Sequence, residues 1–205
     1  MLSFVNLDGE YMKKNIVVIT GHPNQKSFCR AMAKSYIDSA LGKGHTVFDL
    51  NLIDLHFDPI LRSGYASIQE LEEDLVDAQE KIKNADHIAL IYPNWWGAPP
   101  ALLKGFIERV FLPGFAFQYV PNSIMPKQLL KNKTVDLIVT MDTPIWIYKL
   151  FLGSRGIKLI NESVINFCGM KTKKIILVGP IKKSSEGQRQ KWIDKVKKIA
   201  TRETF

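Results

Sequence analysis

The residues best suited to chemistry in this 205-residue chain lie in three loops, each directly after an apolar run. The first loop, residues 21–27, leads into a predicted helix, and a helix N-terminus favours a phosphate or another anion. His22 and Lys26 add donors, and Ser27 could donate to the anion or serve only as the helix N-cap. The loop lacks the glycine spacing of a dinucleotide fingerprint or a P-loop.

The second loop, residues 93–100, reads PNWWGAPP and is both rigid and aromatic. Its prolines restrict the backbone, and Gly97 allows the backbone to approach a ligand closely. Trp95 and Trp96 suit a flat, conjugated ligand that stacks on the rings and takes hydrogen bonds at its edge. The alternative for one of the two tryptophans is a place in the core or in a subunit interface.

The third loop, residues 140–144, reads TMDTP and precedes another predicted helix. Asp142 or Thr143 is expected at the N-cap and Pro144 at the first helical position. The positive end of that helix could stabilise negative charge that develops on a bound ring.

Other classes of site have little support. The four histidines and two cysteines show no metal-ligand spacing, and no G-x-S-x-G elbow is present, so hydrolysis by a metal or a serine is not predicted. Cys29 follows the first loop and could have a lowered thiol pKa, but a small buried core residue is the favoured role. Although the net charge is +8, no nucleic-acid motif accompanies the lysines, so nucleic acid is not expected as a partner.

Localisation follows from the cysteines and the apolar runs. Two cysteines far apart in the chain indicate no disulfide framework, which favours a reducing cytoplasm. The N-terminus lacks the basic-then-apolar pattern of a secretory signal, and no apolar run is long enough to insert into a membrane. A cytoplasmic protein is therefore expected.

The elements that must position the three loops alternate between strands and helices. β-branched apolar runs predict strands over 15–20, 46–50, 86–92, 134–141 and 174–178. Helical spacing predicts helices over 28–41, 101–111, 145–152 and 157–167. Two further helices are expected to begin at capping boxes, one from Ser67 to Glu70 and the last from Ser185 to Gln188. This alternation predicts a doubly wound α/β fold with a parallel sheet, whose ligands bind at the carboxyl ends of the strands.

Taken together, the loops resemble the flavodoxin-like NAD(P)H:quinone oxidoreductase family, which includes bacterial quinone and drug reductases and potassium-efflux ancillary reductases. The matching motifs are GHP...SF (21–28), FDP (57–59), PNWWGAPPALLKGFIERVFLPGFAF (93–117) and FCG (167–169). The resemblance covers residues 14 to 180. It implies a three-layer sandwich with a five-stranded parallel sheet in the order 2-1-3-4-5, formed by residues 14–205 behind an N-terminal arm, residues 1–13.

The resemblance also implies a function. The expected protein is a homodimer that passes hydride from NAD(P)H through a non-covalent flavin to a quinone in a ping-pong reaction, with FAD favoured over FMN. Tyr148 matches the family's active-site tyrosine. The residues expected to contact the flavin are His22, Ser27, Phe28, Cys29, Pro93, Asn94, Trp95, Trp96, Thr140, Met141, Asp142 and Thr143.

Two departures from the family pattern bear on this function. The usual Gly-Gly of the third loop is Asp142-Thr143, and the family's active-site histidine falls at Ser154. An aspartate aimed at a reduced, anionic flavin would oppose reduction, so we expect Asp142 to turn away and cap the following helix. The missing histidine supports the alternative of a regulatory or ancillary subunit, or an electron carrier, with little turnover.

Overall fold

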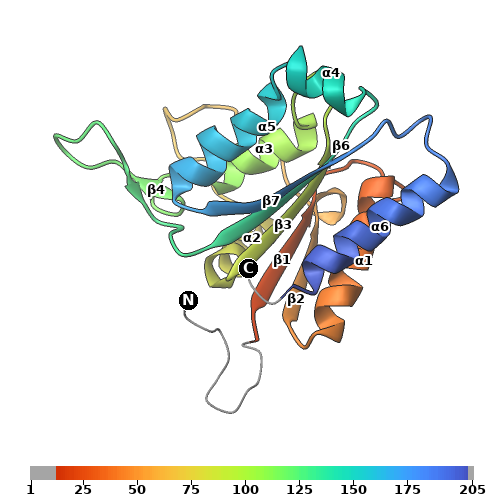
Figure 1. Ribbon diagram of the computed structural model, residues 1–205. Coiled ribbons are helices and arrows are strands. Elements are labelled where there is room, and N and C mark those ends of the chain that lie inside the picture. The colour runs from red at the N-terminus through yellow and green to blue at the C-terminus, as the bar shows by residue number, and fades with distance from the viewer. Residues whose placement is uncertain (1–12, 203–205) are drawn as a thin grey trace.

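Five parallel strands form the centre of the molecule in the computed structural model, which describes residues 13–202 (Figure 1). They are β1 (Asn15–Thr20), β2 (Thr46–Asn51), β3 (His87–Pro93), β6 (Thr134–Thr140) and β7 (Lys171–Val178). Their order is β2-β1-β3-β6-β7, which is the predicted 2-1-3-4-5 order once the short hairpin β4 (Phe117–Gln118) and β5 (Lys127–Gln128) is left out. The fold class is therefore confirmed, while nearly all of the expected N-terminal arm lies outside the described residues.

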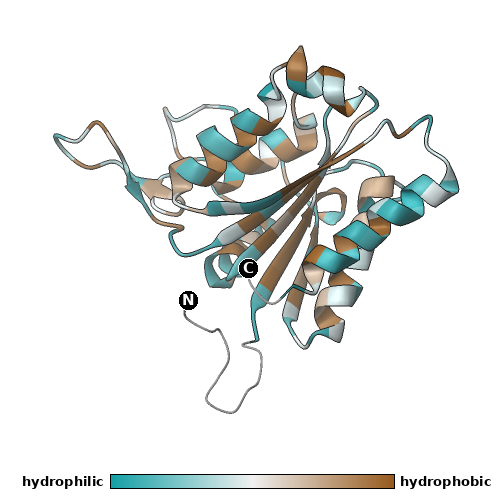
Figure 2. Cartoon of the chain, viewed as in Figure 1, coloured by the Kyte–Doolittle hydropathy of each residue, from teal (hydrophilic) through white to brown (hydrophobic). Residues whose placement is uncertain are grey.

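Helices cover both faces of the sheet. One apolar cluster joins the sheet to α1 (Phe28–Gly42) and α6 (Glu186–Ala200), and the other joins it to α2 (Glu73–Asn84), α3 (Ala101–Val110) and α5 (Arg155–Ile160). Every residue of β3 is buried, as expected for a strand covered on both faces. Figure 2 shows the sheet as an apolar centre between helices of mixed hydropathy.

The chain reverses direction across the sheet between β1 and β3. From β1 it passes outward to β2 and then returns to the other side of β1 as β3. At such a switch point the loops after the two central strands diverge and leave a crevice at the carboxyl edge. The first two candidate loops follow β1 and β3, and the third follows the neighbouring strand β6, so the topology places all three at this edge.

Most helices begin where the sequence predicted. Ser27 caps α1, and Ser185 with Gln188 forms the capping box of α6. The helix after the third loop is α4 (Ile145–Leu150). The next helix, α5, continues directly into a π-helical turn, η2 (Asn161–Asn166). A 3-10 turn, η1 (Leu52–Asp54), follows β2. No helix within residues 13–202 is long and apolar enough to cross a membrane.

The predicted start of α2 is wrong. The helix begins at Glu73 rather than at the Ser67–Glu70 capping box, and Ile68, expected on its apolar face, is 96% exposed. The cause lies in another helix, because Arg109 of α3 binds Glu70 and Glu72, and residues 68–72 have no regular secondary structure. Glu72, at the N-cap of α2, has extended backbone angles and no side-chain capping bond.

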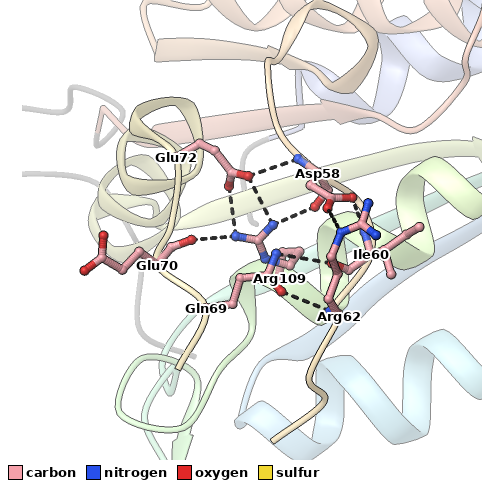
Figure 3. A network of polar contacts seen from close by, with 7 residues as sticks. All are labelled: Asp58, Ile60, Arg62, Gln69, Glu70, Glu72 and Arg109. Atoms are coloured by element: carbon pink, nitrogen blue, oxygen red, sulfur yellow. Dashed lines mark hydrogen bonds and ion pairs between the residues drawn. The ribbon is translucent and has the colours of Figure 1, made fainter. Parts of the chain in front are cut away.

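Arg109 forms a network with the segment that precedes α2 (Figure 3). Its guanidinium, which is completely buried, donates to both carboxylate oxygens of Glu72 at 3.2 and 2.9 Å. It also donates to the backbone oxygens of Asp58 at 2.6 Å and Glu70 at 2.7 Å. Burial alone would raise the pKa of Glu72, but the N–H of Asp58 and the guanidinium more than offset this and lower it. The ion pair therefore fixes residues 58–72 against α3.

A second buried polar cluster lies near the amino ends of the strands. Asp136 of β6 is fully buried and accepts two hydrogen bonds from Arg202, at 2.7 and 3.0 Å, and one from the Tyr36 hydroxyl at 3.3 Å. The Nε2 atom of His87 lies 3.2 Å from Asp136, and its Nδ1 lies 2.8 Å from the Thr134 hydroxyl. Burial lowers the pKa of His87, and Asp136 opposes this only in part.

This cluster predicts a loss of stability in mild acid. Because the pKa of His87 is lowered in the folded protein, the unfolded chain binds a proton that the folded protein does not. The free energy of unfolding should therefore fall as pH drops below the unfolded value of about 6.5, by up to about 1.4 kcal/mol per pH unit. Urea unfolding between pH 7 and pH 5 measures this slope.

Two variants assign the slope to His87. His87→Gln should make the pH dependence shallower, since the buried group no longer titrates. His56→Gln removes an exposed histidine and should leave the slope close to that of the wild type. Equal slopes in His87→Gln and the wild type would contradict the assignment.

Candidate functional site

A hollow of about 460 Å³ lies at the carboxyl edge of the sheet, between the ends of β1, β3 and β6. We call it the loop pocket. Every residue predicted to contact a flavin lines it: His22, Ser27, Phe28, Cys29, Pro93, Asn94, Trp95, Trp96, Thr140, Met141, Asp142 and Thr143. Asn24, Ile181 and Lys182 also line it. Within residues 13–202, no group of three or more His, Cys, Asp or Glu side chains could hold a metal ion.

The first loop presents neutral donors to the pocket. The Nδ1 atom of His22 accepts the N–H of Asn24 at 2.9 Å, which leaves the ring proton on Nε2. Burial lowers the pKa of His22, partly opposed by the Asn24 hydrogen bond, so the ring is neutral at pH 7. Ser27 accepts the N–H of Arg30 at 3.2 Å, while the N–H groups of Phe28 and Cys29 lie in the first turn, where they have no intrahelical acceptor. This end of the pocket suits an anion.

Cys29 is a buried thiol at the floor of the pocket. Its sulfur lies 3.3 Å from the Thr140 hydroxyl, and burial raises its pKa to about 12. The alternative of a lowered thiol pKa is therefore wrong, and the favoured role as a small core residue is supported. The Thr140 hydroxyl and the first-turn N–H of Cys29 each lower the pKa, but burial outweighs them because the sulfur packs inward, between α1 and the sheet.

The second loop closes in a tight turn centred on Trp96 and Gly97. Trp95 and Ala98 exchange two backbone hydrogen bonds of 2.9 Å, and the two central residues have φ of 52° and 78°. These are the signs of a type I′ turn, which glycine adopts freely and tryptophan only at a cost. Trp95 lies edge-on to His22, with ring centroids 5.3 Å apart, whereas Trp96 is fully exposed at the pocket rim.

The third loop differs from its prediction. Neither Asp142 nor Thr143 caps α4, whose N-cap is Pro144 without a side-chain hydrogen bond. Asp142 does turn to another donor, because its carboxylate accepts the backbone N–H of Lys182 at 2.8 Å and lies 3.5 Å from the Lys182 ammonium. The segment after β7 brings that donor close, since the Ile181 N–H donates to Met141 at 3.1 Å. Sequence reasoning missed Lys182 because it lies 40 residues from Asp142.

A second hollow, of about 500 Å³, adjoins the loop pocket and contains Tyr148. We call it the side hollow. It shares Asn94, Trp96 and Thr143 with the loop pocket, and its other lining residues are Gly97, Tyr148, Leu152 and Arg155. The Tyr148 hydroxyl accepts the N–H of Ile157 at 3.2 Å, and burial raises its pKa, so it is a neutral phenol. Ser154, where the resemblance places a histidine, does not line either hollow.

The helix α5 packs closely against the second loop, which borders both hollows. A Cβ atom added to Gly156 would lie 2.2 Å from the carbonyl oxygen of Gly97 and 2.6 Å from the side-chain oxygen of Asn94. Only a glycine therefore lets α5 approach the second loop this closely. The side-chain oxygen of Asn94 is buried and has no hydrogen-bond partner within the described part of the chain.

The fold and the pocket define a doubly wound α/β protein with a ligand site at the strand switch point. The chain belongs to the family described as having a flavodoxin-like fold, whose model matches residues 14–200. This match confirms the resemblance found from the loop motifs.

Named relatives point the same way. A protein of Haemophilus influenzae named "Uncharacterized NAD(P)H oxidoreductase" is 32% identical over 188 residues, covering 88% of this chain and 91% of that one. NAD(P)H dehydrogenase [quinone] 1 of Cavia porcellus is 29% identical over 76% of this chain and 65% of its own length. A crystal structure from Streptococcus mutans UA159 is 31% identical, with a TM-score of 0.74 over 93% of this chain and 99% of that chain.

Proposed function

We propose that this protein is an NAD(P)H-dependent flavoprotein oxidoreductase that delivers two electrons to a quinone or a similar acceptor. The observation that carries the proposal is the loop pocket, which gathers every residue expected to contact a flavin from three separate loops. The names of the relatives from Haemophilus influenzae and Cavia porcellus support NAD(P)H as the donor and a quinone as the acceptor.

The residues present fit a flavin. Trp95, Trp96 and Met141 supply apolar and aromatic surface for a flat ring, and Asn94, which also lines the pocket, adds an amide side chain. The first turn of α1 and the His22 Nε2–H supply donors for a phosphate. A bound flavin accepts hydride from a nicotinamide and passes two electrons to a second substrate.

We favour FAD over FMN as the flavin. In the first loop, Ser27 is the one hydroxyl side chain, and its oxygen already caps α1, whereas an FMN phosphate is commonly held by several hydroxyls. Phe28 also lines the pocket, and its ring lies 6.1 Å from that of Trp192, so apolar surface continues toward α6 and could take an adenine. Mass analysis of the released flavin separates the two cofactors.

The protein's own part is to position the reactants and supply a proton donor. The side hollow adjoins the loop pocket through Asn94, Trp96 and Thr143, so a second substrate held there would lie beside the ring site. Because the Tyr148 hydroxyl accepts from Ile157, its own proton is available to a group in the side hollow. The nicotinamide and the acceptor would occupy this space in turn, which is a ping-pong reaction.

We also propose that the protein is a cytoplasmic homodimer. The hairpin β4–β5 projects from the body of the molecule (Figure 1). A hollow of about 540 Å³, lined in part by Tyr119 of this hairpin, lies beside it. The connection between β4 and β5 exposes four apolar residues, Tyr119, Val120, Ile124 and Met125, and a second copy of the chain would cover them. Both cysteines are free thiols, which agrees with a reducing compartment. Light scattering should give twice the chain mass, and a monomer would contradict the dimer.

Steady-state oxidation of NADH and NADPH by the flavin-loaded protein tests the proposed function. The rate should rise when menadione is added, because the acceptor reoxidises the flavin. A flavin-loaded protein with no menadione-stimulated rate would contradict the enzyme and favour the regulatory or electron-carrier alternative.

The two tryptophans of the second loop should differ in their effect on flavin binding. Trp96 lines both hollows, whereas Trp95 lines the loop pocket alone and makes an edge-to-face contact with the His22 ring. Trp96→Ala should therefore raise the dissociation constant of the flavin by about tenfold, which corresponds to the loss of one aromatic stacking contact. Trp95→Ala should raise it less. Fluorescence titration of the apoprotein measures both, and the reverse order would mean that the loop meets the flavin in another register.

A further inference from the structure

The side hollow carries a single charge. Of the residues that line it, Arg155 alone is ionised at neutral pH, because Tyr148 is a neutral phenol and the others are uncharged. No carboxylate within residues 13–202 forms an ion pair with Arg155. In the loop pocket, by contrast, Lys182 is paired with Asp142. The guanidinium therefore keeps its full capacity to bind an anion.

The backbone of Arg155 is held in place from both sides. Gly153 and Ser154 precede it with φ of 60° and 54°, so the chain makes a left-handed turn directly before α5. The N–H of Ser154 donates to the carbonyl of Tyr148 at 3.1 Å. Gly156 follows, in direct backbone contact with Gly97. The backbone at position 155 therefore lies beside the second loop.

Most of the other walls of the side hollow are aromatic or apolar, and Asn94 adds one polar side chain. Trp96, Tyr148 and Leu152 line it together with the short Thr143 and the backbone at Gly97. A flat ring fits such walls, and a guanidinium binds an ionised oxygen with charge-assisted hydrogen bonds. Together these features favour a conjugated ring that bears a negative charge.

We propose that Arg155 makes this protein select electron acceptors that carry a negatively charged oxygen on a conjugated ring, of which an ionised hydroxynaphthoquinone is the simplest example. The inference rests on the proposed function and names the acceptor class for the same site. Arg155 binds the charged oxygen of the acceptor and transfers neither electrons nor a proton. NAD(P)H gives hydride, which is two electrons and a proton, and the quinone takes these with one further proton, which Tyr148 donates and solvent then replaces, to become the hydroquinone.

Lawsone and menadione provide a matched pair of acceptors. Both are naphthoquinones of similar size, but the hydroxyl of lawsone is ionised at neutral pH, whereas menadione is uncharged. The flavin-loaded full chain is assayed with each as wild type, Arg155→Met and Arg155→Lys. Lys158→Met is the control, because it removes a cation from the same helix that does not line the side hollow.

Loss of the charge should change the choice between the acceptors. In Arg155→Met, the ratio of kcat/KM for lawsone to that for menadione should fall by about tenfold or more, as expected for a lost hydrogen bond to a charged group. Arg155→Lys should recover part of the ratio, and Lys158→Met should keep it. An unchanged ratio in Arg155→Met, or the same fall in Lys158→Met, would overturn the proposal.

A binding measurement separates this inference from the proposed function. Calorimetric titration of lawsone into the oxidised, flavin-loaded protein should show binding that weakens about tenfold in Arg155→Met, and this readout needs no turnover. If wild type and variant bind lawsone equally, the inference fails even if NAD(P)H oxidation is normal. If the variant instead alters the preference for NADPH over NADH and leaves lawsone unaffected, Arg155 binds the nicotinamide cofactor and the acceptor proposal is overturned.

Discussion

Gly156→Ala is expected to cost the protein most of its flavin affinity. The added Cβ would lie 2.2 Å from the carbonyl oxygen of Gly97, a backbone atom that cannot move without the whole second loop. Either α5 or the loop must shift, and overpacking of this kind typically costs about 1–3 kcal/mol of stability. Since the same loop carries Asn94 and Trp96, we expect the dissociation constant of the flavin to rise at least about tenfold. Fluorescence titration of the apoprotein measures it.

Gly187→Ala is the matched control for this substitution. Gly187 lies in the first turn of α6, and a Cβ there would meet no other atom within 4 Å. The change should leave flavin binding unaltered and should raise stability by about 0.5–1 kcal/mol, because alanine favours a helix. Wild-type flavin affinity in Gly156→Ala would show that the contact between α5 and the second loop does not shape the pocket.

Arg109→Met should cause the largest loss of stability. It removes a completely buried guanidinium, which leaves the backbone oxygens of Asp58 and Glu70 without this donor and the Glu72 carboxylate with the Asp58 N–H as its remaining one among the described residues. Removal of one partner of a buried ion pair commonly costs about 3–5 kcal/mol. The partly exposed Glu72 can take up water, so we expect about 3 kcal/mol, or a fall in Tm of about 6–12 °C. Thermal unfolding followed by circular dichroism measures it.

A neighbouring arginine provides the control. Arg62 pairs with Asp58 in the same network at 2.7 Å, but its side chain is largely exposed. Arg62→Met should therefore lower stability far less than Arg109→Met does. The double variant Arg109→Met with Glu72→Leu should recover part of the loss, because no charge is left without its partner. Equal effects of Arg109→Met and Arg62→Met would contradict the importance of the buried pair.

The sheet was predictable because its signal is local. Each strand is marked by its own apolar, β-branched residues, such as Ile16, Val17, Val18 and Ile19, which are all buried. The alternation with helices then restricts the topology to parallel strands and right-handed connections. The meeting of the three loops followed from the same signal, since they are the segments after three of these strands and must share one edge.

The features that were missed depend on contacts between distant residues. The start of α2 is decided by Arg109, which lies 37 residues from Glu72, and this contact overrides a capping pattern that is locally plausible. The partner of Asp142 depends on Lys182 in the same way. Gly156 lies directly before the predicted helix 157–167, and its contact with Gly97 exists only in the folded chain. The hairpin β4–β5 has paired strands of two residues each, which is too short for a periodic pattern.

Anaerobic titration of the flavin-loaded protein with NADPH or NADH tests the central claim, that the loop pocket holds a flavin which exchanges electrons with a nicotinamide and a quinone. One equivalent of the effective nucleotide should bleach the visible absorption of the flavin, and menadione added afterwards should restore it. A protein that binds no flavin, or whose bound flavin stays oxidised in excess NADPH and in excess NADH, would contradict the claim.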